Sequence, residues 1–544
     1  MIWTIIIIVM KVKETQSVCL CRLGRLPLRK EGTIMLLSSA DNMRDADRRA
    51  ITEEPYKIPS IALMEKASHA VAEAAIPWLR DGGCAVILCG SGNNGGDGVG
   101  AAVELKKAGY PVRVLLTGSR DHTTPDWREM ARRLEALGTC VEDFDPDRGL
   151  GMAAVVIDAI FGIGLNKSVG GRALAAIEAI NAAHTAGAGV VSADIASGVE
   201  ADTGRILGAA VRSDCTVTFS MAKPGHFAEP GCTFCGRLTI ADIGIPGDIL
   251  AACGSGVHAV LDEDVSLPHR NPLSHKGDYG KVLVLGGSVG YTGAPTLCAR
   301  SAVRSGAGLV YLGVPAPIYN ITAMKNDEAM PFSLPDGKDG LSPLGVDTAV
   351  ERLAGMDVCA AGPGLGRSRG TVALVDALLH AESGSGIPLV LDADALSALQ
   401  GHLEWLREHA APVILTPHEG EFVRMGGLLT GNRVEDARRF AAAHGCVLVL
   451  KGHRCIAAFP DGEAYIATRG NPGMAKGGSG DVLTGIVAAL CAQFPGAEKR
   501  AVTTAMQLHA LAGDLCKAAL GEYAMTATDM IAMLPEATIK LMEG

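Results

Sequence analysis

Short aliphatic runs that end in glycine-rich turns recur along this chain, and longer helical stretches separate them. In the first half these runs begin at residues 84, 111, 153 and 189, with the sequences CAVILCG, PVRVLLTG, AAVVIDAIFG and GVVSADIASG. Residues 61–79 and 99–110 are expected to be helices, with residues 91–98, SGNNGGDG, as a loop. A strand that leads into a helix and then into another strand forms a βαβ unit, so the pattern predicts an α/β fold.

The same alternation restarts after a proline-punctuated stretch at residues 267–280. Its aliphatic runs begin at residues 281, 308, 358, 388, 412 and 446, and residues 457–468 predict a hairpin around a Pro-Asp-Gly turn. At 544 residues the chain exceeds what one hydrophobic core usually serves, and we find no convincing internal repeat. We therefore expect two different α/β domains, at residues 35–262 and 265–544.

Residues 1–34 precede the first domain and do not fit its pattern. Their apolar run, WTIIIIVM, is too short to span a bilayer, and charged residues follow it instead of preceding it. A secretory signal has the opposite order and a small-residue cleavage site. We expect a non-native or disordered leader, with the true start at Met35.

Charge and cysteine usage restrict the partners and the compartment. The net charge is −10, from 49 Lys and Arg against 59 Asp and Glu, and 4% of the residues are aromatic. We therefore expect no nucleic-acid partner and no membrane partner. The 15 cysteines lie mostly singly in apolar runs, which is typical of reduced cytosolic proteins. The sequence predicts a cytoplasmic homo-oligomer that acts on small molecules.

The segment GSGNNG, residues 90–95, matches the G-x-G-x-x-G pattern of dinucleotide-binding folds. That fingerprint also needs an acidic residue at the end of the second strand, where this chain has LLTGSR. An ordinary nicotinamide dehydrogenase is therefore disfavoured. The segment still offers backbone N–H groups at a helix N-terminus, which suit a phosphate, together with oxygens from Asn93, Asn94 and Asp97.

Two aspartates end the next two strands of the first half. Asp158 and Asp194 stand where ligands of open parallel sheets collect, and Ser197 follows them. Carboxylate, carboxamide and hydroxyl oxygens beside a glycine-rich turn suit a hard cation. Alternatively, each aspartate only caps a helix, although finding both beside NNGGDG favours the cation site.

Five motifs between residues 63 and 225 resemble the NAD(P)HX epimerase family: LMEKAS, GSGNNGGDG, DAIFGIGL, DIASG with DTG, and FSMAKPG. The resemblance implies a Rossmann-like fold and interconversion of the R and S forms of hydrated NAD(P)H. It implies that Asp194 contacts the substrate and moves protons, because inverting the C6 hydroxyl needs its transient loss and return. Ala196 stands where the family usually has proline, which would loosen the turn that carries Ser197.

The same resemblance implies two sets of binding residues. The potassium ligands would be Asn94, Asp158 and Ser197. The hydrate would lie along Asn93, Asn94, Gly95, Gly96, Asp97, Gly162, Ile163, Gly164, Leu165, Asn166, Lys167, Ser168 and Asp194.

In the second half, polar residues again follow strands and open a helix. His418 follows the strand that begins near 412, and Lys451 ends the strand that begins near 446. Residues 477–480 place backbone N–H groups at a helix N-terminus, which suits an anion, and Asp481 lies within the first turn. Taken alone, His418 would be a solvated turn residue, Lys451 a surface lysine and Asp481 a helix cap.

Eight motifs from residue 274 onward are similar to the ADP-dependent (S)-NAD(P)HX dehydratases, which have a ribokinase-like fold: SHKGDYG, GGSVGYTGAP, GAGLV, GPGLG, LDADAL, TPHEGEF, LKGHRC and GNPGMAKGGSGD. The resemblance implies that ADP phosphorylates the hydroxyl of the hydrate with Asp481 as base, and that phosphate then leaves. We expect Mg²⁺ to accompany the ADP, because phosphoryl transfer usually involves it. The hydrate would contact Ala294, Gly364, His418 and Asp481. The adenine nucleotide would contact Lys451, Gly452, His453, Arg454, Cys455 and Gly480, with Cys455 replacing the family's usual threonine.

Together the two halves resemble the bifunctional NAD(P)H-hydrate repair enzymes, whose substrates are NADHX and NADPHX. Two other interpretations stay open. One is a small-molecule kinase of the hydroxymethylpyrimidine type, which shares the fold and the aspartate base but leaves a stable phosphorylated product. The other is a ligand-binding or scaffold protein whose first half has lost catalysis.

Overall fold

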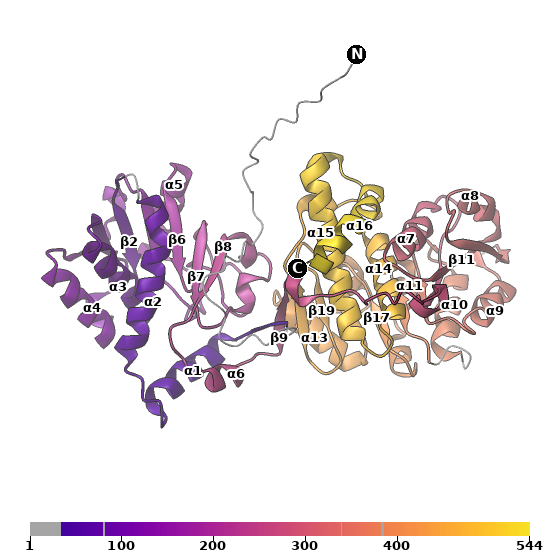
Figure 1. Ribbon diagram of the computed structural model, residues 1–544, viewed down its shortest axis with the longest axis horizontal. Helices are drawn as coiled ribbons and strands as arrows, with labels where there is room; N and C mark the ends of the chain where they lie inside the picture. Colours follow the sequence, from indigo (N-terminus) through magenta and orange to yellow (C-terminus); the bar gives the residue numbers. More distant parts are fainter. Residues whose placement is uncertain (1–33, 80–81, 339, 382–385, 544) are drawn as a thin grey trace, which may run out of the picture.

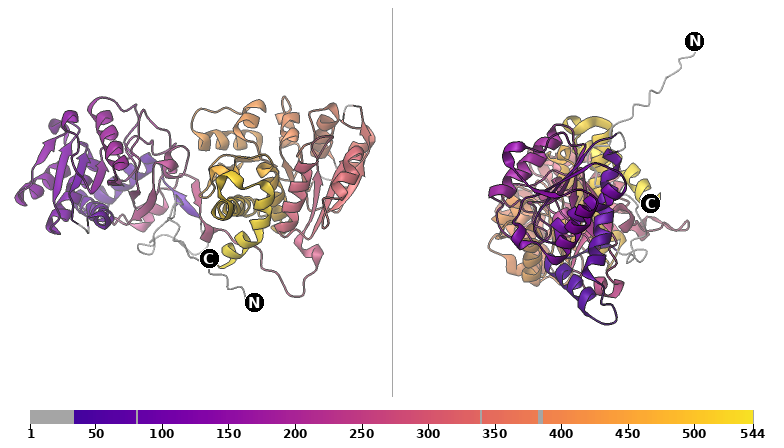
Figure 2. Two further views of the ribbon diagram at one scale, coloured as in Figure 1. Left: turned by 90° about the horizontal axis from the view of Figure 1, so that it is seen from above. Right: turned by 90° about the vertical axis from the view of Figure 1, so that its left-hand side faces the viewer.

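The computed structural model describes residues 34–79, 82–338, 340–381 and 386–543. The described chain forms two lobes that lie side by side, each built on its own β-sheet (Figure 1). A second view shows the same two lobes (Figure 2). The predicted leader lies outside the described residues, apart from residue 34. No helix within the described ranges is long and apolar enough to cross a bilayer.

The sheet of the first lobe has seven strands within the described residues, in the order β4-β3-β2-β5-β6-β7-β8, and all neighbouring pairs are parallel. The strands are β2 (Ala85–Cys89), β3 (Val112–Leu116), β4 (Val141–Asp143), β5 (Val155–Ala159), β6 (Gly189–Ala193), β7 (Cys215–Phe219) and β8 (Arg237–Ala241). The helices are α1 (Ala40–Thr52), α2 (Ser60–Ala75), α3 (Asn93–Lys107), α4 (Pro125–Ala136), α5 (Gly171–Thr185) and α6 (Gly247–Ala251). Chain order reverses between β2 and β5, and such a switch point opens a ligand crevice at the carboxyl ends of the strands.

The predicted loop at residues 91–98 is wrong, because α3 already begins at Asn93. The glycines of this segment have low helix propensity, which favoured a loop in the sequence. In the structure they let α3 pack closely on α2. A Cβ on Gly96 would lie 2.6 Å from Met64 Cε, and one on Gly100 would lie 2.0 Å from Ser68 Oγ. Tertiary packing therefore overrides local propensity here.

The sheet of the second lobe has eleven strands within the described residues, in the order β1-β9-β20-β19-β18-β17-β16-β15-β10-β11-β12. The strands are β1 (Met35–Leu37), β9 (Val257–Val260), β10 (Lys281–Leu285), β11 (Leu309–Pro315), β12 (Met330–Leu334), β15 (Val358–Ala361), β16 (Leu389–Leu391), β17 (Val413–Leu415), β18 (Val447–Leu450), β19 (Ile456–Ala458) and β20 (Ala464–Ala467). The pair β19/β20 is antiparallel, which confirms the predicted hairpin. The pairs β1/β9 and β18/β19 are also antiparallel, and the other pairs are parallel.

Helices cover this second sheet on both faces, which explains why its strands are continuous aliphatic runs. In β10, Val282 and Val284 pack into one core with α14 (Ser479–Gln493), whereas Leu283 and Leu285 pack into another core with α10 (Arg369–His380). The helices are α7 (Gly293–Arg304), α8 (Tyr319–Ala323), α9 (Pro343–Glu351), α10 (Arg369–His380), α11 (Asp394–Ala398), α12 (Glu419–Arg424), α13 (Arg433–His444), α14 (Ser479–Gln493), α15 (Glu498–Ala524) and α16 (Ala527–Glu543). The predicted α/β fold of both halves is confirmed.

The two ends of the first lobe are both tied into the second sheet. Strand β9 pairs with β20, and β1 pairs with β9, so residues 35–37 and 257–260 belong to the larger sheet. Both segments precede the boundary that we expect between residues 262 and 265. The first lobe is therefore held by two strands that lie side by side, not by a single linker.

Candidate active sites

The first candidate site lies at the carboxyl ends of β2, β5 and β6. Asp158 in β5 is completely buried, and its Oδ1 accepts a hydrogen bond from the Ser197 hydroxyl at 2.6 Å. Its Oδ2 accepts bonds from the Ser197 N–H and the Ser192 hydroxyl, both at 2.8 Å. The loops that follow Asp158 and Asp194 do not lead directly into a described helix, so neither aspartate is a helix cap. Asp158 holds the turn after β6 against the loop after β5.

Asn94 faces this same pair of loops. Its carboxamide is buried, yet neither its oxygen nor its nitrogen has a hydrogen-bond partner among the described residues. A Cβ on Gly162 would lie 3.2 Å from Asn94 Oδ1, so the Gly162 turn lies directly against it. The loop after β5 also contacts Ser197, whose Oγ accepts from the Phe161 N–H at 2.9 Å. Asn94, Asp158 and Ser197 therefore surround one short loop.

Asp194 follows β6 with a φ of 64°, a left-handed conformation that is costly for a residue other than glycine. Its Oδ1 lies 2.6 Å from Lys223 Nζ and accepts a hydrogen bond from the Thr218 hydroxyl at 3.1 Å. Burial by itself would raise the pKa of Asp194, but the Lys223 ammonium outweighs burial and lowers it. Asp194 is therefore an ionised carboxylate at neutral pH.

Two further carboxyl groups near Asp194 have raised pKa values, in contrast to the lowered pKa of Asp194. Burial, and next the Asp194 carboxylate, raise the pKa of Asp97 well above its usual value. The same two causes raise the pKa of Asp47, in α1, to about 6. The first site thus holds one carboxyl group with a lowered pKa, Asp194, and two with raised pKa values, Asp97 and Asp47.

The other residues of the expected hydrate-binding set differ in accessibility. Gly95 and Gly96 are buried, and a Cβ on Gly95 would lie 1.9 Å from the Gly90 carbonyl oxygen, so they serve close packing. Leu165 packs into the core beside α5. The exposed members of the set are Asn93, Gly164, Asn166, Lys167 and Ser168. Gly162 and Ile163 are half-buried.

The second candidate site lies where β16, β17 and β18 end and α14 begins. Asp392, directly after β16, is 1% exposed, with Oδ1 2.7 Å from Lys451 Nζ. Its Oδ2 accepts a hydrogen bond from the Thr484 hydroxyl of α14 at 2.7 Å. Burial opposes ionisation of Asp392, but Lys451 outweighs burial and lowers its pKa. Asp392 thereby fixes the Lys451 ammonium beside α14.

Asp481 is the third residue of α14, and the helix begins after Gly478, whose φ is 96°. A Cβ on Gly480 would lie 3.1 Å from Lys451 Nζ, so the lysine ammonium reaches the first turn. Burial, and next the Asp392 carboxylate, raise the pKa of Asp481 to about 7. A proton-accepting carboxyl group and a lysine therefore share a helix N-terminus whose free N–H groups suit an anion.

The residues expected to contact the hydrate in the second lobe lie in two parts of the fold, at the switch point between β10 and β15 and beside Lys451. Gly364 has a φ of 68°, and a Cβ there would lie 3.3 Å from the Ala294 Cβ at the start of α7. These two residues meet at the switch point between β10 and β15. His418 lies beside Lys451 through a parallel bridge, and its Nδ1 accepts from the Gly420 N–H at 3.0 Å. His418 therefore also caps α12.

Side chains of the loop at residues 451–455 face in two directions, some toward α14 and some toward the first lobe. Lys451 faces α14, whereas Arg454 is 5% exposed and, like Arg433, interacts electrostatically with Glu229 of the first lobe. Arg433 Nη1 lies 2.7 Å from Glu229 Oε2, and Arg433 Nη2 donates to the Lys451 carbonyl oxygen at 3.2 Å. Gly452 is exposed, and His453 and Cys455 are half-buried.

Comparisons with known proteins cover both lobes. A family model described as YjeF-related protein N-terminus matches residues 60–225, and one described as NAD(P)H-hydrate dehydratase matches residues 282–536. The bifunctional NAD(P)H-hydrate repair enzyme Nnr of Moorella thermoacetica is 42% identical over 521 residues, covering 92% of this chain and 96% of that relative. The chain belongs to the bifunctional NAD(P)H-hydrate repair enzymes. The family indicated by the motifs of both halves is thereby confirmed.

A second curated relative matches over a comparable length, and a solved structure matches about half of the chain. The enzyme of the same name from Thermofilum pendens is 36% identical, covering 94% of this chain and 97% of that relative. A solved structure, the ADP/ATP-dependent NAD(P)H-hydrate dehydratase of Bacillus subtilis with ATP and Mg²⁺, is 31% identical with a TM-score of 0.44. It covers 52% of this chain and 97% of that chain.

In this member of the repair enzymes, several residues complete the sites without having been singled out in the sequence. They are Asp47, Thr218, Lys223 and His226 in the first lobe, and Asp392, Thr484 and Arg433 in the second. Asp392 carries a signal that could have found it, because it follows a strand just as Asp158 and Asp194 end theirs. Lys223 lies within FSMAKPG, but no local pattern indicates that its side chain is buried.

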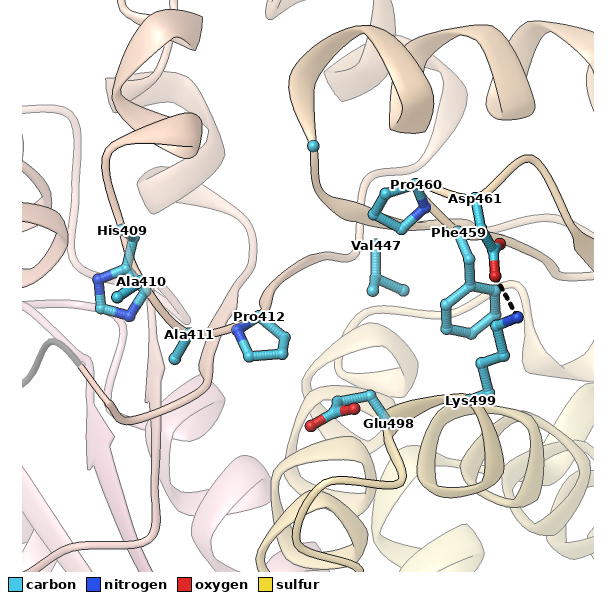
Figure 3. A pocket seen from close by; sticks show the side chains of 11 residues that line it. His409, Ala410, Ala411, Pro412, Val447, Phe459, Pro460, Asp461, Glu498 and Lys499 are labelled. Atoms are coloured by element: carbon cyan, nitrogen blue, oxygen red, sulfur yellow. Dashed lines mark hydrogen bonds and ion pairs between the residues drawn. The ribbon is translucent and has the colours of Figure 1, made fainter.

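A separate hollow of about 430 Å³ lies on the second lobe (Figure 3). It is lined by residues that include Pro412, Val447 and Phe459, with Lys499 paired to Asp461. Pro412 and Val447 stand at the amino ends of β17 and β18, opposite to the edge that carries Lys451. The hollow is therefore separate from the candidate active site of this lobe.

Proposed function

We propose that this protein repairs hydrated NAD(P)H in two steps. The first lobe interconverts the R and S forms of NAD(P)HX, and the second lobe dehydrates the S form while ADP becomes AMP and phosphate. The observation that carries the proposal is that each lobe holds two neighbouring carboxyl groups whose pKa values are shifted in opposite directions. The pKa of Asp194 is lowered, whereas that of the neighbouring Asp97 is raised well above its usual value. The pKa of Asp392 is lowered, whereas that of the neighbouring Asp481 is raised to about 7. Pairs of acids with separated pKa values are typical of acid–base sites.

In the first lobe, the bond between C6 and its hydroxyl breaks and forms again. Asp97 gives its proton to the C6 hydroxyl, the electron pair of the ring nitrogen forms a double bond to C6, and water leaves. The resemblance assigns proton movement to Asp194, but its lowered pKa leaves it without a proton to give, so its carboxylate instead stabilises the positive charge on the ring. Water then adds to either face of C6, and the released proton returns to Asp97, so that both epimers are reached.

Asn94, Asp158 and Ser197 would hold a potassium ion. Their oxygens are of the type that hard cations prefer, and the buried Asn94 carboxamide, which lacks a partner among the described residues, fits such an ion. When bound, the ion would attract the phosphate-bearing substrate and neutralise charge at the loops after β5 and β6. Asp158 would act mainly by orienting Ser197, because both of its oxygens already accept hydrogen bonds.

In the second lobe, Asp481 takes the proton of the C6 hydroxyl as that oxygen attacks the terminal phosphorus of ADP and AMP leaves. Lys451 and the N–H groups at the start of α14 stabilise the charge on the transferred phosphoryl group. The phosphate then leaves C6 with its electron pair, C5 loses a proton to solvent, and the electron pair of that C–H bond forms the C5–C6 double bond, which restores the dihydronicotinamide ring. Phosphate is a far better leaving group than hydroxide.

Magnesium would enter this second site together with the nucleotide. Within the described ranges, no cluster of three or more His, Cys, Asp or Glu side chains is arranged to hold a metal ion. Mg²⁺ is commonly held by substrate phosphates and one or two carboxylates, and it neutralises charge on the phosphates when bound. The residues of this chain would then orient the phosphates through Lys451 and α14.

The test is the recovery of NADH, followed by absorbance at 340 nm, from a mixture of R and S NADHX with and without ADP. We expect full recovery only with ADP in potassium buffer, and slower conversion of the R form when choline replaces potassium. Recovery of the S form alone would contradict the epimerase assignment. A phosphorylated product that persists, with no NADH, would instead indicate a small-molecule kinase.

A further inference from the structure

Lys223 is the buried charge of the first lobe that these steps leave without a role. Its side chain is 2% exposed, and its ammonium donates to Asp194 Oδ1 at 2.6 Å. It also donates to Thr218 Oγ1 at 2.8 Å and lies 3.5 Å from the Phe219 carbonyl oxygen. An ammonium has three hydrogens, so all of them are directed into the protein. Lysine is almost never fully buried unless it is paired, and here the charged partner is Asp194.

The backbone of Lys223 acts on the same aspartate through His226. The Lys223 N–H donates to His226 Nδ1 at 3.0 Å, and His226 Nε2 lies 2.9 Å from the Asp194 carbonyl oxygen. Because Nδ1 accepts a hydrogen bond, Nε2 carries the ring hydrogen and donates to that carbonyl. Lys223 therefore supports both the carboxylate and the left-handed backbone of Asp194.

We propose that Lys223 is a positioning residue for the epimerase reaction, which fixes the Asp194 carboxylate and its turn against the bound hydrate. The inference rests on the function proposed for the first lobe. A buried ion pair gives little net stability, because desolvation offsets the attraction. A strained backbone persists only where its surroundings hold it, and such strain clusters at functional sites. Both features fit a role in orienting a reacting group.

The charged and titratable groups that face Asp194 come from three segments. Asp47 lies in α1, Asp97 in α3, and Lys223 and His226 follow β7. Burial, and next Lys223, lower the pKa of His226 to about 4, so this histidine is neutral. Without Lys223, Asp194 would keep two acidic neighbours and lose its cation, and its pKa would rise. The epimerase rate would then be lost as the pH falls, because the ionised form of Asp194 is the one required.

The test compares Lys223→Met and Lys223→Arg in the full chain, with Lys107→Met as the control. Lys107 is an exposed lysine at the far end of α3, paired with Glu104 on the same helix. We expect Lys223→Met to lower the rate of R-to-S conversion by on the order of 100-fold at pH 7, mainly in kcat. Dehydration of the pure S form with ADP should be unchanged in all three variants, which shows that the chain is folded.

The pH profile separates positioning from a merely structural role. In the native protein, protonation of Asp194 should not lower the epimerase rate between about pH 9 and 6. In Lys223→Met, the residual epimerase rate should be lost as the pH falls through that range. Lys223→Arg keeps the charge and should keep the native profile even if its rate is lower. Repeating the Lys223→Met profile with Asp47→Asn added removes the contribution of Asp47. An unchanged rate and profile in Lys223→Met would overturn the inference, whereas a native protein without epimerase activity would overturn the proposed function itself.

Discussion

At the scale of single residues, Asp481 shows how a catalytic carboxyl group lowers stability. Its pKa is raised to about 7, because burial and the neighbouring Asp392 both oppose its ionisation. The group must be ionised to accept a proton, so the dehydratase rate should fall as the pH decreases below about 7. In the unfolded chain the pKa returns to its ordinary value of 3.8, so the folded state binds this proton more tightly. Stability from this group is therefore lost as the pH rises from 4 through 7.

Asp481→Asn should abolish ADP-dependent NADH formation and still make the protein more stable at pH 8. The free energy of unfolding should rise by on the order of 3 kcal/mol there, because the variant avoids the cost of a buried negative charge. Urea unfolding at pH 8 and at pH 5 measures this, and the gain should shrink at pH 5. An equal gain at both pH values, or remaining dehydratase activity, would contradict the assigned role.

At the scale of secondary-structure elements, the start of α14 depends on Gly478. A Cβ there would lie 2.6 Å from Leu297 Cδ1 and 2.9 Å from the Ala527 Cβ, and its φ is 96°. Gly478→Ala should lower the free energy of unfolding by about 1–3 kcal/mol and raise the KM for ADP, because the N–H groups of the first turn would be displaced. Thermal unfolding and steady-state kinetics with ADP measure the two effects.

Gly477→Ala is the matched control for that change. The position precedes the same helix, but no atom lies within 4 Å of an added Cβ and its φ is not in the left-handed region. Stability and KM should stay at native values. If both alanine variants raised the KM equally, the geometry of the Gly478 turn would not be what aligns the nucleotide.

At the scale of the whole molecule, Arg433 connects the lobes through an ion pair. Its side chain is 10% exposed and lies 2.7 Å from Glu229 Oε2 of the first lobe and 2.8 Å from Glu419 Oε1 of the second. It also contacts the backbone of the loop at residues 451–455. Both lobes therefore meet at the segment expected to bind the nucleotide.

Arg433→Met should lower the free energy of unfolding by about 2 kcal/mol, because it removes the ion-pair partner of the partly buried Glu229. Faster proteolysis between the lobes should accompany this loss. The control is Arg439→Met on the same helix, whose side chain is 69% exposed and pairs with Glu435 of that helix. Thermal unfolding of the two variants decides the question, and equal midpoints would mean that the contact between the lobes adds no stability.

The sequence by itself determined the α/β class, most strands and the polar residues that end them, such as Asp158, Asp194 and Lys451. These features are local, since aliphatic runs report burial and the residues after a parallel strand all reach one edge of a sheet. The tertiary structure alone decided where α3 begins and which side chains pair. Lys223 and Asp194 are 29 residues apart, Lys451 and Asp392 are 59 apart, and Arg433 and Glu229 are 204 apart. Pairs at such separations depend on strand order and loop paths, which neighbouring residues do not encode, so only the folded chain shows which carboxyl groups stay ionised.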